Sequence, residues 1–500
     1  MLGEHWDRDR RHRWRRWSTR WRVWLLSRRN RHATITVLAL LSLFAVLRVT
    51  QSLLEYRRRL AWTVDTLPPA QVEAFTDRLW RETQRFDPDT PRGLVLPLFD
   101  DIAVLGLSLL LQLRHQQVTL PVEVPHCGDL SLELQTAVRE RDPLVRLYDV
   151  CEMAAEAALQ DESGRRPLFC VDLGHCHHKF RSFDIKVLAV VYSRFQEVML
   201  LDADTLFFQS PMSLWETRKY QETGTLFFND RISYELSYLA ARAPDSDGHV
   251  EINVGAMHRF LAGFDVTPYR RFGVVDSSEP RLQRPRRMLG LDFGYQPSTF
   301  LLNSHVWSLR SGHQMDSSLV LWDKVRQPRA TAILASFVSL NGLPVPPSYG
   351  DKEAWWLACE LGETAYSFSD FAVGTVGWEL LTAGRQNDGV LCGDALQHYP
   401  VQTNPAKGPE ADVEPLYMNS DNILEWGQGS RRLYRTAARP AELYPGSFTE
   451  QKLLQTCPFD VTTMEITPLE AMLLTQRTEL YDVMAGWIDE RSGTWWNPFA

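Results

Sequence analysis

The stretch "EVMLLDADTLFFQSP", residues 197–211, places two aspartates directly after an apolar run. A short, continuous apolar run is typical of a strand buried on both faces, so we expect residues 198–201 to form one. Asp202 and Asp204 then follow at its carboxyl end. Three other D-x-D patterns lie in polar or Pro/Gly-marked stretches. The position after a strand, rather than the pattern itself, therefore singles out this pair.

The segments before this pair alternate between strand and helix patterns. The expected order is strand 93–99, helix 101–116, strand 120–126, strand 166–173, helix 183–195 and strand 197–208. This order predicts an α/β fold with a mainly parallel sheet flanked by helices. Ligands bind beyond the carboxyl ends of the strands in such sheets, which is where Asp202 and Asp204 fall.

The alternation continues less regularly after residue 208. The expected elements are a short helix near 212–220, a strand at 224–231, and a strand and a helix within 315–342. A further helix is expected to begin directly after Asp351, Lys352 and Glu353. Within residues 389–400 we expect a strand that leads into a loop, and this loop contains His398. Residues 232–314 are rich in Pro, Gly and Arg, and we interpret them as an irregular surface insertion.

Charge is divided unevenly along the 500 residues. Residues 1–32 hold eleven arginines and three acidic residues, a net charge of +8, whereas the whole chain carries −8 and the remainder therefore −16. A run rich in Arg and Trp can bind nucleic acid. Because an uncharged apolar run, residues 33–47, follows it, we expect a membrane partner and no nucleic acid.

Residues 33–54 are expected to form one transmembrane helix. About 20 apolar residues span a bilayer, and this segment suffices if Arg48 reaches the far headgroups. The N-terminal arginines place that side in the cytosol by the positive-inside rule. The expected order is a basic cytosolic tail (1–32), a signal anchor (33–54), a stem with a helix from Pro69 (55–90) and a lumenal domain (91–500). The alternative is a buried helix after a basic tail.

All seven cysteines follow the apolar segment. In a lumenal compartment some should form disulfides, and an odd number leaves at least one over. The stretch "CVDLGHCHHKF", residues 170–180, combines cysteines and histidines, but their order does not match the usual spacing of zinc ligands. We therefore do not expect a zinc site in this stretch, and we assign no disulfide pairs among the seven cysteines.

Two carboxylates one residue apart at a strand end can share a divalent cation. Oxygen ligands suit Mg²⁺ and Mn²⁺, and both ions leave positions open for phosphates. A cation there would hold the diphosphate of a sugar nucleotide and offset the charge that builds on the leaving group. Aspartate after a strand also commonly caps a turn, so the residues alone leave both interpretations open.

Four further residues have a functional and a structural interpretation. His398 could complete a Mn²⁺ site, although a lone histidine is more often structural. Lys186, in the helix expected before Asp202, could reach a phosphate or lie on a solvated helix face. Asp351 and Glu353 could contact sugar hydroxyls or assist proton transfer, and at a helix start they are also favoured by the dipole alone.

In this order, the segments resemble the fungal Golgi α-1,3-mannosyltransferases. The matching stretches, within residues 93–419, are "SRFQEVMLLDADTLFFQSP", "GTLFFNDR", "MDSSLVLWDK", "GDKEAWWLACEL" and "LCGDALQHYP…PLYMN". The resemblance implies a GT-A fold, with a Rossmann-like mixed, mainly parallel sheet flanked by helices and preceded by one transmembrane helix. It also implies a type II Golgi membrane topology, GDP-mannose as donor and dependence on Mn²⁺.

The resemblance implies metal binding by Asp202 and Asp204, metal or phosphate binding by His398, and contacts with the donor sugar or the acceptor by Asp351, Lys352 and Glu353. We expect Asp351 and Glu353 to be the catalytic residues, and Asp202 and Lys352 to bind the donor. Lys186 joins the expected donor-binding residues because of its place in the helix before Asp202, not because of the resemblance. The chain departs from the family at Ser317-Ser318, where members usually read Ser-Gly, and in the insertion at 232–314.

We therefore expect a glycosyltransferase that moves mannose from GDP-mannose to a mannose-containing glycan, with retention of the α configuration. Its expected partners are the nucleotide-sugar donor, the glycan acceptor, the membrane and other members of a glycosyltransferase complex. No residue can be named as a nucleophile. Two alternatives stay open, a retaining transferase that uses a UDP-sugar, because D-x-D does not read the base, and a catalytically silent, membrane-anchored subunit of a glycosylation complex.

Overall fold

A computed structural model describes residues 69–161, 164–231, 237–242, 253–275, 287–340, 343–382, 385–401, 414–420, 432–434 and 463–492. The chain divides into two compact units, 1–65 and 66–500, and all described residues belong to the second. The tail and the span expected within residues 1–54 lie outside the described residues. Among the helices that are described, none has the length and apolarity needed to cross a bilayer.

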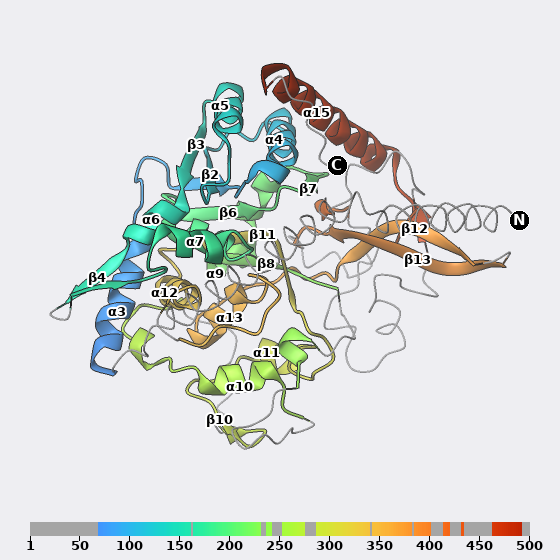
Figure 1. Cartoon of the computed structure of the whole chain (residues 1–500). Helices are drawn as coiled ribbons and strands as arrows, with labels where there is room; N and C mark the ends of the chain where they lie inside the picture. Colours follow the sequence, from blue (N-terminus) through green and yellow to red (C-terminus); the bar gives the residue numbers. More distant parts are fainter. Residues whose placement is uncertain are drawn as a thin grey trace, which may run out of the picture. The chain divides into compact units, whose positions relative to one another are not determined.

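The centre of the second unit is a six-stranded mixed sheet (Figure 1). Its strands, in spatial order, are β3 (Val145–Asp149), β2 (Val122–His126), β1 (Arg92–Val95), β6 (Glu197–Leu201), β11 (Met315–Asp323) and β8 (Thr225–Asn229). The pairings from β3 to β6 are parallel, and β11 is antiparallel to both of its neighbours. The predicted mixed, mainly parallel sheet is therefore confirmed.

Helices cover both faces of this sheet because successive residues of each strand point to opposite sides. In β6, Val198 and Leu200 belong to one apolar core and Met199 and Leu201 to the other. The first core includes residues of α3 (Pro69–Glu82), α8 (Ile185–Tyr192), α12 (Pro328–Phe337) and α13 (Ala354–Leu361). The second includes residues of α4 (Asp100–His115), α5 (Leu132–Arg141) and α15 (Pro468–Ser492), and Figure 1 shows these helices together.

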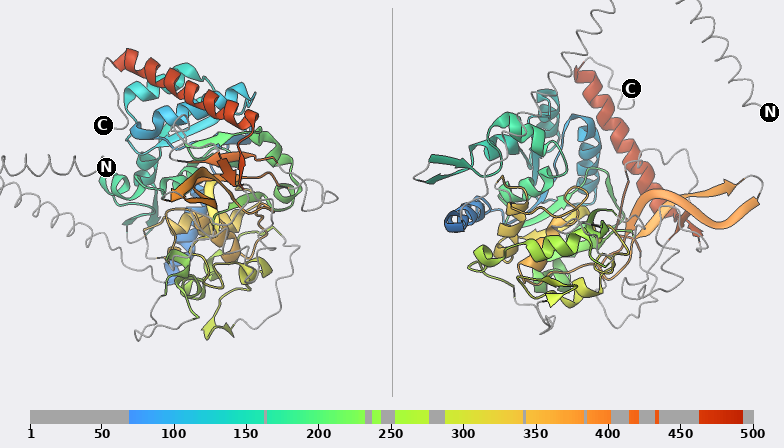
Figure 2. Two further views of the ribbon diagram at one scale, coloured as in Figure 1. Left: turned by 90° about the vertical axis from the view of Figure 1, so that its right-hand side faces the viewer. Right: turned by 60° about the horizontal axis from the view of Figure 1, so that its bottom comes forward.

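A second six-stranded sheet is entirely antiparallel. Its strands, in spatial order, are β16 (Thr463–Glu465), β15 (Arg432–Tyr434), β12 (Gly374–Thr382), β13 (Arg385–His398), β14 (Tyr417–Asn419) and β7 (Thr205–Phe207). β12 and β13 form the long hairpin drawn in orange in Figure 2. The sequence patterns did not reveal this sheet.

This second sheet corrects two expectations. The single strand expected at 197–208 is two strands, β6 and β7, which belong to different sheets. Asp202 and Asp204 therefore lie where the chain passes from one sheet to the other. His398 was expected in a loop, but it is the last residue of β13 and pairs with Tyr417 of β14.

The strand expected at 166–173 is wrong for most of its length. Only β5 (Gly164–Pro167) is a strand, paired with β4 (Ala158–Asp161), and α7 (Leu173–Phe180) follows. Asp172 ends the apolar run by capping α7, since its carboxylate accepts a hydrogen bond from the backbone N–H of His175 at 2.7 Å. Apolar character without a period cannot separate a strand from another buried segment.

The surface interpretation of residues 232–314 is wrong for the described parts. These parts hold η2 (Tyr238–Ala240), α10 (Ala256–Gly263), η3 (Thr267–Tyr269), β9 (Arg287–Met288), β10 (Leu291–Asp292) and α11 (Thr299–Asn303). The side chains of Met257, Leu261 and Leu301 are fully buried in the first core. Proline and glycine mark turns here, but the residues between them pack.

The remaining described elements are α6 (Val150–Glu156), η1 (Pro211–Glu216) and α9 (Arg218–Thr223). The helix predicted in the stem, α3, packs against α12 and buries Phe75 and Leu79 completely. Phe75 and Leu79 lie four residues apart, so both point from one face of the helix.

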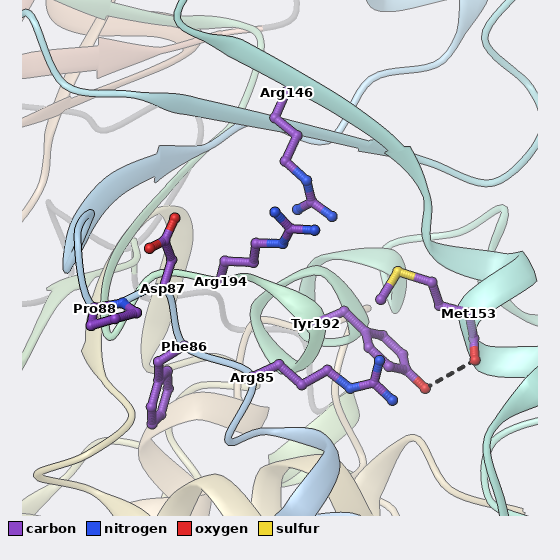
Figure 3. A pocket seen from close by; sticks show the side chains of 8 residues that line it. All are labelled: Arg85, Phe86, Asp87, Pro88, Arg146, Met153, Tyr192 and Arg194. Atoms are coloured by element: carbon purple, nitrogen blue, oxygen red, sulfur yellow. Dashed lines mark hydrogen bonds between the residues drawn. The ribbon is translucent and has the colours of Figure 1, made fainter.

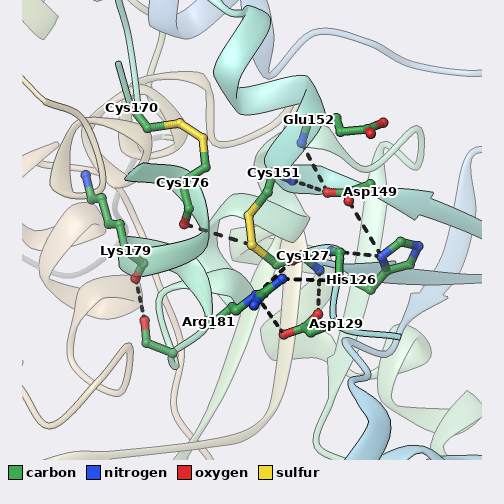
Figure 4. Close-up of a disulfide and its surroundings, with 12 residues drawn as sticks. His126, Cys127, Asp129, Asp149, Cys151, Glu152, Cys170, Cys176, Lys179 and Arg181 are labelled. Carbon is green, nitrogen blue, oxygen red and sulfur yellow. Dashed lines mark hydrogen bonds and ion pairs between the residues drawn. A yellow bond between two sulfur atoms is a disulfide. The ribbon is translucent and has the colours of Figure 1, made fainter. Parts of the chain in front are cut away.

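Disulfides form as expected in the second unit. Figure 4 shows Cys127 joined to Cys151 and Cys170 joined to Cys176. The second bond uses both cysteines of the stretch that superficially suggested zinc. Cys359 is buried outside these two bonds.

Candidate active site

A cleft of about 700 Å³ opens at the carboxyl ends of β1, β2 and β6. This is the edge at which parallel α/β sheets bind ligands. One part of its wall is apolar and includes Pro97, Leu98 and Ile102, whereas Lys186, Asp202 and Asp204 bring charge to another part. An apolar wall with a few convergent charged groups is typical of a small-molecule site.

Asp202 and Lys186 form an ion pair in this cleft. Lys186 Nζ lies 2.6 Å from Oδ1 of Asp202 and 3.5 Å from Oδ1 of Asp351. Desolvation raises the pKa of Asp202 to about 6, against the influence of Lys186, and Asp351 adds to the rise. For Lys186, burial alone would lower the pKa, but Asp202 and Asp351 hold it above the ordinary value. The lysine is therefore charged and held between two carboxylates.

Asp204, the second aspartate of the pair, also lines the cleft. Asn419 Nδ2 donates a hydrogen bond to its Oδ1 at 2.6 Å, and the backbone N–H of Ser420 donates to its carbonyl oxygen at 3.3 Å. Asn419 pairs with Thr205 across β14 and β7, so the second sheet fixes the orientation of Asp204.

A second polar network lies inside the sheet beside Asp202. His398 Nε2 is 2.7 Å from Oδ2 of Asp316, and Ser318 Oγ donates to the same oxygen at 2.9 Å. Although burial alone would raise the pKa of Asp316, His398, Lys352 and Ser318 hold it below the ordinary value. Ser318, one of the departures from the family pattern, thus takes part in this network.

Lys352 is bound to a residue that the sequence patterns did not single out. Its Nζ lies 2.6 Å from Oδ2 of Asp230, which directly follows β8. Burial alone would lower the pKa of Lys352, but Asp230 and Asp316 hold it above the ordinary value. Asp230 could have been found by the criterion that singled out Asp202, because it also follows an apolar strand. Asp316 carries no such signal, since it lies within β11.

Asp351 and Glu353 are held by the two tryptophans of α13. Trp355 Nε1 donates to Oδ2 of Asp351 at 2.9 Å, and Trp356 Nε1 donates to Oε2 of Glu353 at 2.5 Å. Glu353 is fully buried and also accepts a hydrogen bond from the backbone N–H of Gln314 at 3.0 Å. Neither acid lines the cleft. Asp351 reaches the site through Lys186, whereas Glu353 is enclosed.

The residues fit a divalent cation in part. Asp202 and Asp204 offer carboxylate oxygens on the wall of one cleft. Across the part of the chain that the structure describes, no three His, Cys, Asp or Glu side chains gather as a metal site. Two carboxylates suffice for an ion that takes its other ligands from water and substrate phosphates. His398 is engaged by Asp316 and does not join the pair as a third ligand.

The C-terminal helix α15 supplies two residues to the site. Arg477 donates hydrogen bonds to the carbonyl oxygens of Ala203, at 2.8 Å, and of Leu105, at 3.0 Å, and to Oγ of Ser108. Tyr481, one turn further along, lines the cleft. Sequence patterns gave no sign of these contacts, because they join residues far apart in the chain.

A second cavity, of about 440 Å³, lies at the opposite edge of the sheet, where β3 and β6 begin. Figure 3 shows Arg85, Arg146 and Arg194 around it, with the ring of Tyr192 below. Glu82 pairs with Arg85, and Glu123 pairs with Arg146 at 2.7 Å. Acidic partners thus offset two of the three arginines, and this cavity is separate from the cleft.

Comparison with known proteins relates the chain to mannosyltransferases. The family model described as mannosyltransferase matches residues 91–399. Alpha-1,3-mannosyltransferase MNT2 of Saccharomyces cerevisiae is 29% identical over 313 residues, which cover 61% of this chain and 49% of that protein. Alpha-1,3-mannosyltransferase MNN1 of the same yeast is 24% identical over 298 residues, which cover 57% of this chain and 35% of that protein. The chain thus spans less than half the length of these two relatives.

Among solved structures, the chain is similar to the bifunctional glycosyltransferase WbbM, with a TM-score of 0.32 and 12% identity. The match covers 57% of this chain and 40% of that chain.

The family match includes most of the site described above. Residues 91–399 contain the Lys186–Asp202 pair, Asp204, the Asp316–His398 pair and the start of α13. The resemblance indicated by the sequence motifs is confirmed, and the chain belongs to this family of mannosyltransferases.

Proposed function

We propose that the protein transfers mannose from GDP-mannose to a mannose-containing glycan, with retention of the α configuration. The observation that carries this proposal is the position of Lys186, Asp202 and Asp204 on one cleft at the carboxyl ends of the parallel strands. The family and the mixed sheet support it, and we assign the sheet to the GT-A type.

In this proposal the apolar part of the cleft takes the nucleoside, and the charged part takes the diphosphate. Asp202 and Asp204 would hold Mn²⁺, which when bound supplies positive charge to the departing diphosphate. Lys186 lies within reach of the same phosphates and keeps Asp202 oriented. Asp351 would fix Lys186 in turn, and Lys352 would act through Asp230 and Asp316.

The reaction would break the bond between mannose C1 and the diphosphate oxygen and form a bond from C1 to the acceptor oxygen. The acceptor hydroxyl would give its proton to the departing diphosphate, because the attacking acceptor oxygen and the leaving diphosphate oxygen lie on the same face of the sugar. No described carboxylate needs to act as a nucleophile in this scheme. Asp351 is a positioning residue here, and Glu353 supports the start of α13 rather than the sugar.

We also propose that the protein is a single-pass type II protein of the Golgi membrane. The basic residues 1–32 and the apolar residues 33–54 support this topology. The disulfides Cys127–Cys151 and Cys170–Cys176 support a lumenal location for the second unit, because disulfides persist in oxidising compartments. Other members of a glycosyltransferase complex belong to the same proposal.

The test uses the full chain in detergent with GDP-mannose, Mn²⁺ and α-mannobiose. We expect mannosyl transfer by the wild type and a loss of at least a hundredfold in the Asp202→Asn/Asp204→Asn double variant. A matched control is Asp87→Asn/Asp89→Asn, another D-x-D pair that does not line the cleft, in which Asp87 accepts hydrogen bonds from the backbone N–H of Asp89, at 3.1 Å, and from the side chain of Thr90. Transfer that survives in the Asp202/Asp204 variant would refute the role of the pair.

The same assay separates the two rivals. Transfer from UDP-sugars but not from GDP-mannose would establish the alternative donor class. A folded wild type that neither transfers nor hydrolyses any of these donors would favour a silent subunit. Binding of GDP-mannose that requires Mn²⁺ would speak against the silent subunit.

A further inference from the structure

Four rings form a continuous aromatic surface next to the cleft. They are Phe183, Tyr349, Tyr238 and His313, which we call the aromatic platform. The ring centroids are 5.5 Å apart for Phe183 and Tyr349, 5.5 Å for Tyr349 and Tyr238, and 4.7 Å for Tyr238 and His313. The rings come from four separate segments, so the fold brings them together.

Two neighbouring rings of the platform, Phe183 and Tyr349, are open to solvent. Phe183 is 50% exposed and Tyr349 is 48% exposed. Large aromatic side chains usually bury most of their surface, so two adjoining rings with this exposure need a partner or a ligand to account for them. Among the residues that the structure describes, none forms a hydrogen bond with the hydroxyl of Tyr349.

The backbone around the platform is built to hold these rings. Gly350 has φ +59°, and a Cβ there would lie 2.6 Å from Cβ of Phe183, so only glycine lets Phe183 pack at this point. Tyr238 has φ +48°, a conformation that is costly for an aromatic residue. Strain of this kind persists where the surroundings fix it, often at ligand sites.

The platform borders the cleft rather than a remote surface. Phe183 lines the cleft, and Lys186 Nζ lies 5.7 Å from the centroid of its ring. Tyr349 is two residues before Asp351, which reaches Lys186. At the other end, Nδ1 of His313 is 3.5 Å from Oε1 of Glu353 and is buried without a hydrogen bond among the described residues.

We propose that the aromatic platform binds a pyranose ring of the acceptor glycan. This inference rests on the proposed function, because an acceptor hydroxyl can reach the donor sugar only from a subsite that adjoins the donor cleft. A pyranose presents C–H groups on one face, which carry slight positive charge and fit the negative face of an aromatic ring. The hydroxyls at the edge of the pyranose ring would contact the hydroxyl of Tyr349 and the ring of His313. The chemistry of the four rings thus matches a neutral sugar better than an anionic ligand.

The first test measures steady-state transfer by the full chain with α-mannobiose. Tyr349→Leu removes a ring and should raise the acceptor KM roughly tenfold while changing kcat little. Tyr349→Phe keeps the ring and should retain most of the acceptor affinity. Leu132→Ala, at an exposed apolar residue on α5, is the control for loss of surface apolar area. An unchanged acceptor KM in both Tyr349→Leu and Phe183→Leu overturns the proposal.

The second test does not depend on the donor. Saturation-transfer NMR on the full chain with α-mannobiose alone should show transfer from aromatic protons to the C–H protons of the sugar, and Tyr349→Leu should reduce it. If the wild type binds mannobiose in this way but does not use GDP-mannose, the result supports the platform and refutes GDP-mannose as the donor. Transfer by the wild type without any aromatic contact in the NMR experiment refutes the platform and keeps the donor.

Discussion

Arg477 in α15 donates a hydrogen bond to the carbonyl oxygen of Ala203 at 2.8 Å, although the two residues are 274 positions apart in the sequence. Ala203 lies between Asp202 and Asp204, so the C-terminal helix holds the segment that carries both aspartates. Arg477 is fully buried, and desolvation lowers its pKa while Asp204 opposes that shift. The position of the candidate metal ligands thus depends on a helix outside the family match.

Replacing Arg477 should loosen this segment. Arg477→Met leaves the carbonyl oxygens of Ala203 and Leu105 without a buried donor, and we expect a loss of ~3 kcal/mol in the free energy of unfolding. The KM for GDP-mannose should rise as well. Thermal unfolding and donor kinetics measure the two effects. Arg218→Met, which removes an arginine that is 83% exposed, should change neither.

The pKa of Asp202 predicts the acid limb of the pH profile. With a pKa of about 6, Asp202 becomes protonated and neutral below that pH and can no longer bind a cation, so kcat/KM should fall as the pH drops below it. Because Lys186 lowers this pKa, Lys186→Met should move the limb to higher pH. The control Lys219→Met breaks a lysine–aspartate pair elsewhere, with Asp370, and should leave the limb in place. A limb that does not move in Lys186→Met would contradict the assignment.

His398 has two candidate roles, as the partner of Asp316 or as a metal ligand, and they predict different effects of its replacement. If His398 serves Asp316, His398→Leu leaves a buried carboxylate poorly paired and should cost ~3 kcal/mol of stability. The double variant Asp316→Asn/His398→Leu should recover part of that loss. Titration of Mn²⁺ in the presence of GDP should then show a much smaller effect in His398→Leu than in Asp202→Asn. An equal loss of Mn²⁺ affinity in both would restore His398 as a ligand.

The disulfide Cys127–Cys151 should support both stability and the cleft. It closes a loop with a sequence separation of 24 and joins the end of β2 to α6, so Cys127→Ala/Cys151→Ala should cost ~3 kcal/mol. The backbone N–H of Cys127 also donates to Oδ1 of Asp129, which lines the cleft. Chemical denaturation of the variant measures the loss. Removal of Cys170–Cys176, with a separation of only 6, should cost less.

Several features of the fold could be predicted from local patterns. The run before Asp202 gave β6, and the charged residues before α13 gave its start, because both signals lie within a few neighbouring residues. The family could be recognised for the same reason, since its motifs are short and keep their order. The prediction of a strand at 166–173 was wrong because an apolar run without helical or strand periodicity does not specify one secondary structure.

The sequence by itself determined the alternating α/β order, the position of Asp202 at a strand end and the family of the chain. Only the tertiary structure decided that β6 and β7 enter different sheets, that His398 binds Asp316 and that Arg477 holds Ala203. Secondary structure follows from periods of a few residues, which any short segment displays. Ion pairs and hydrogen bonds between distant segments form only when packing has removed those groups from water, and no local pattern records which partner each group then meets.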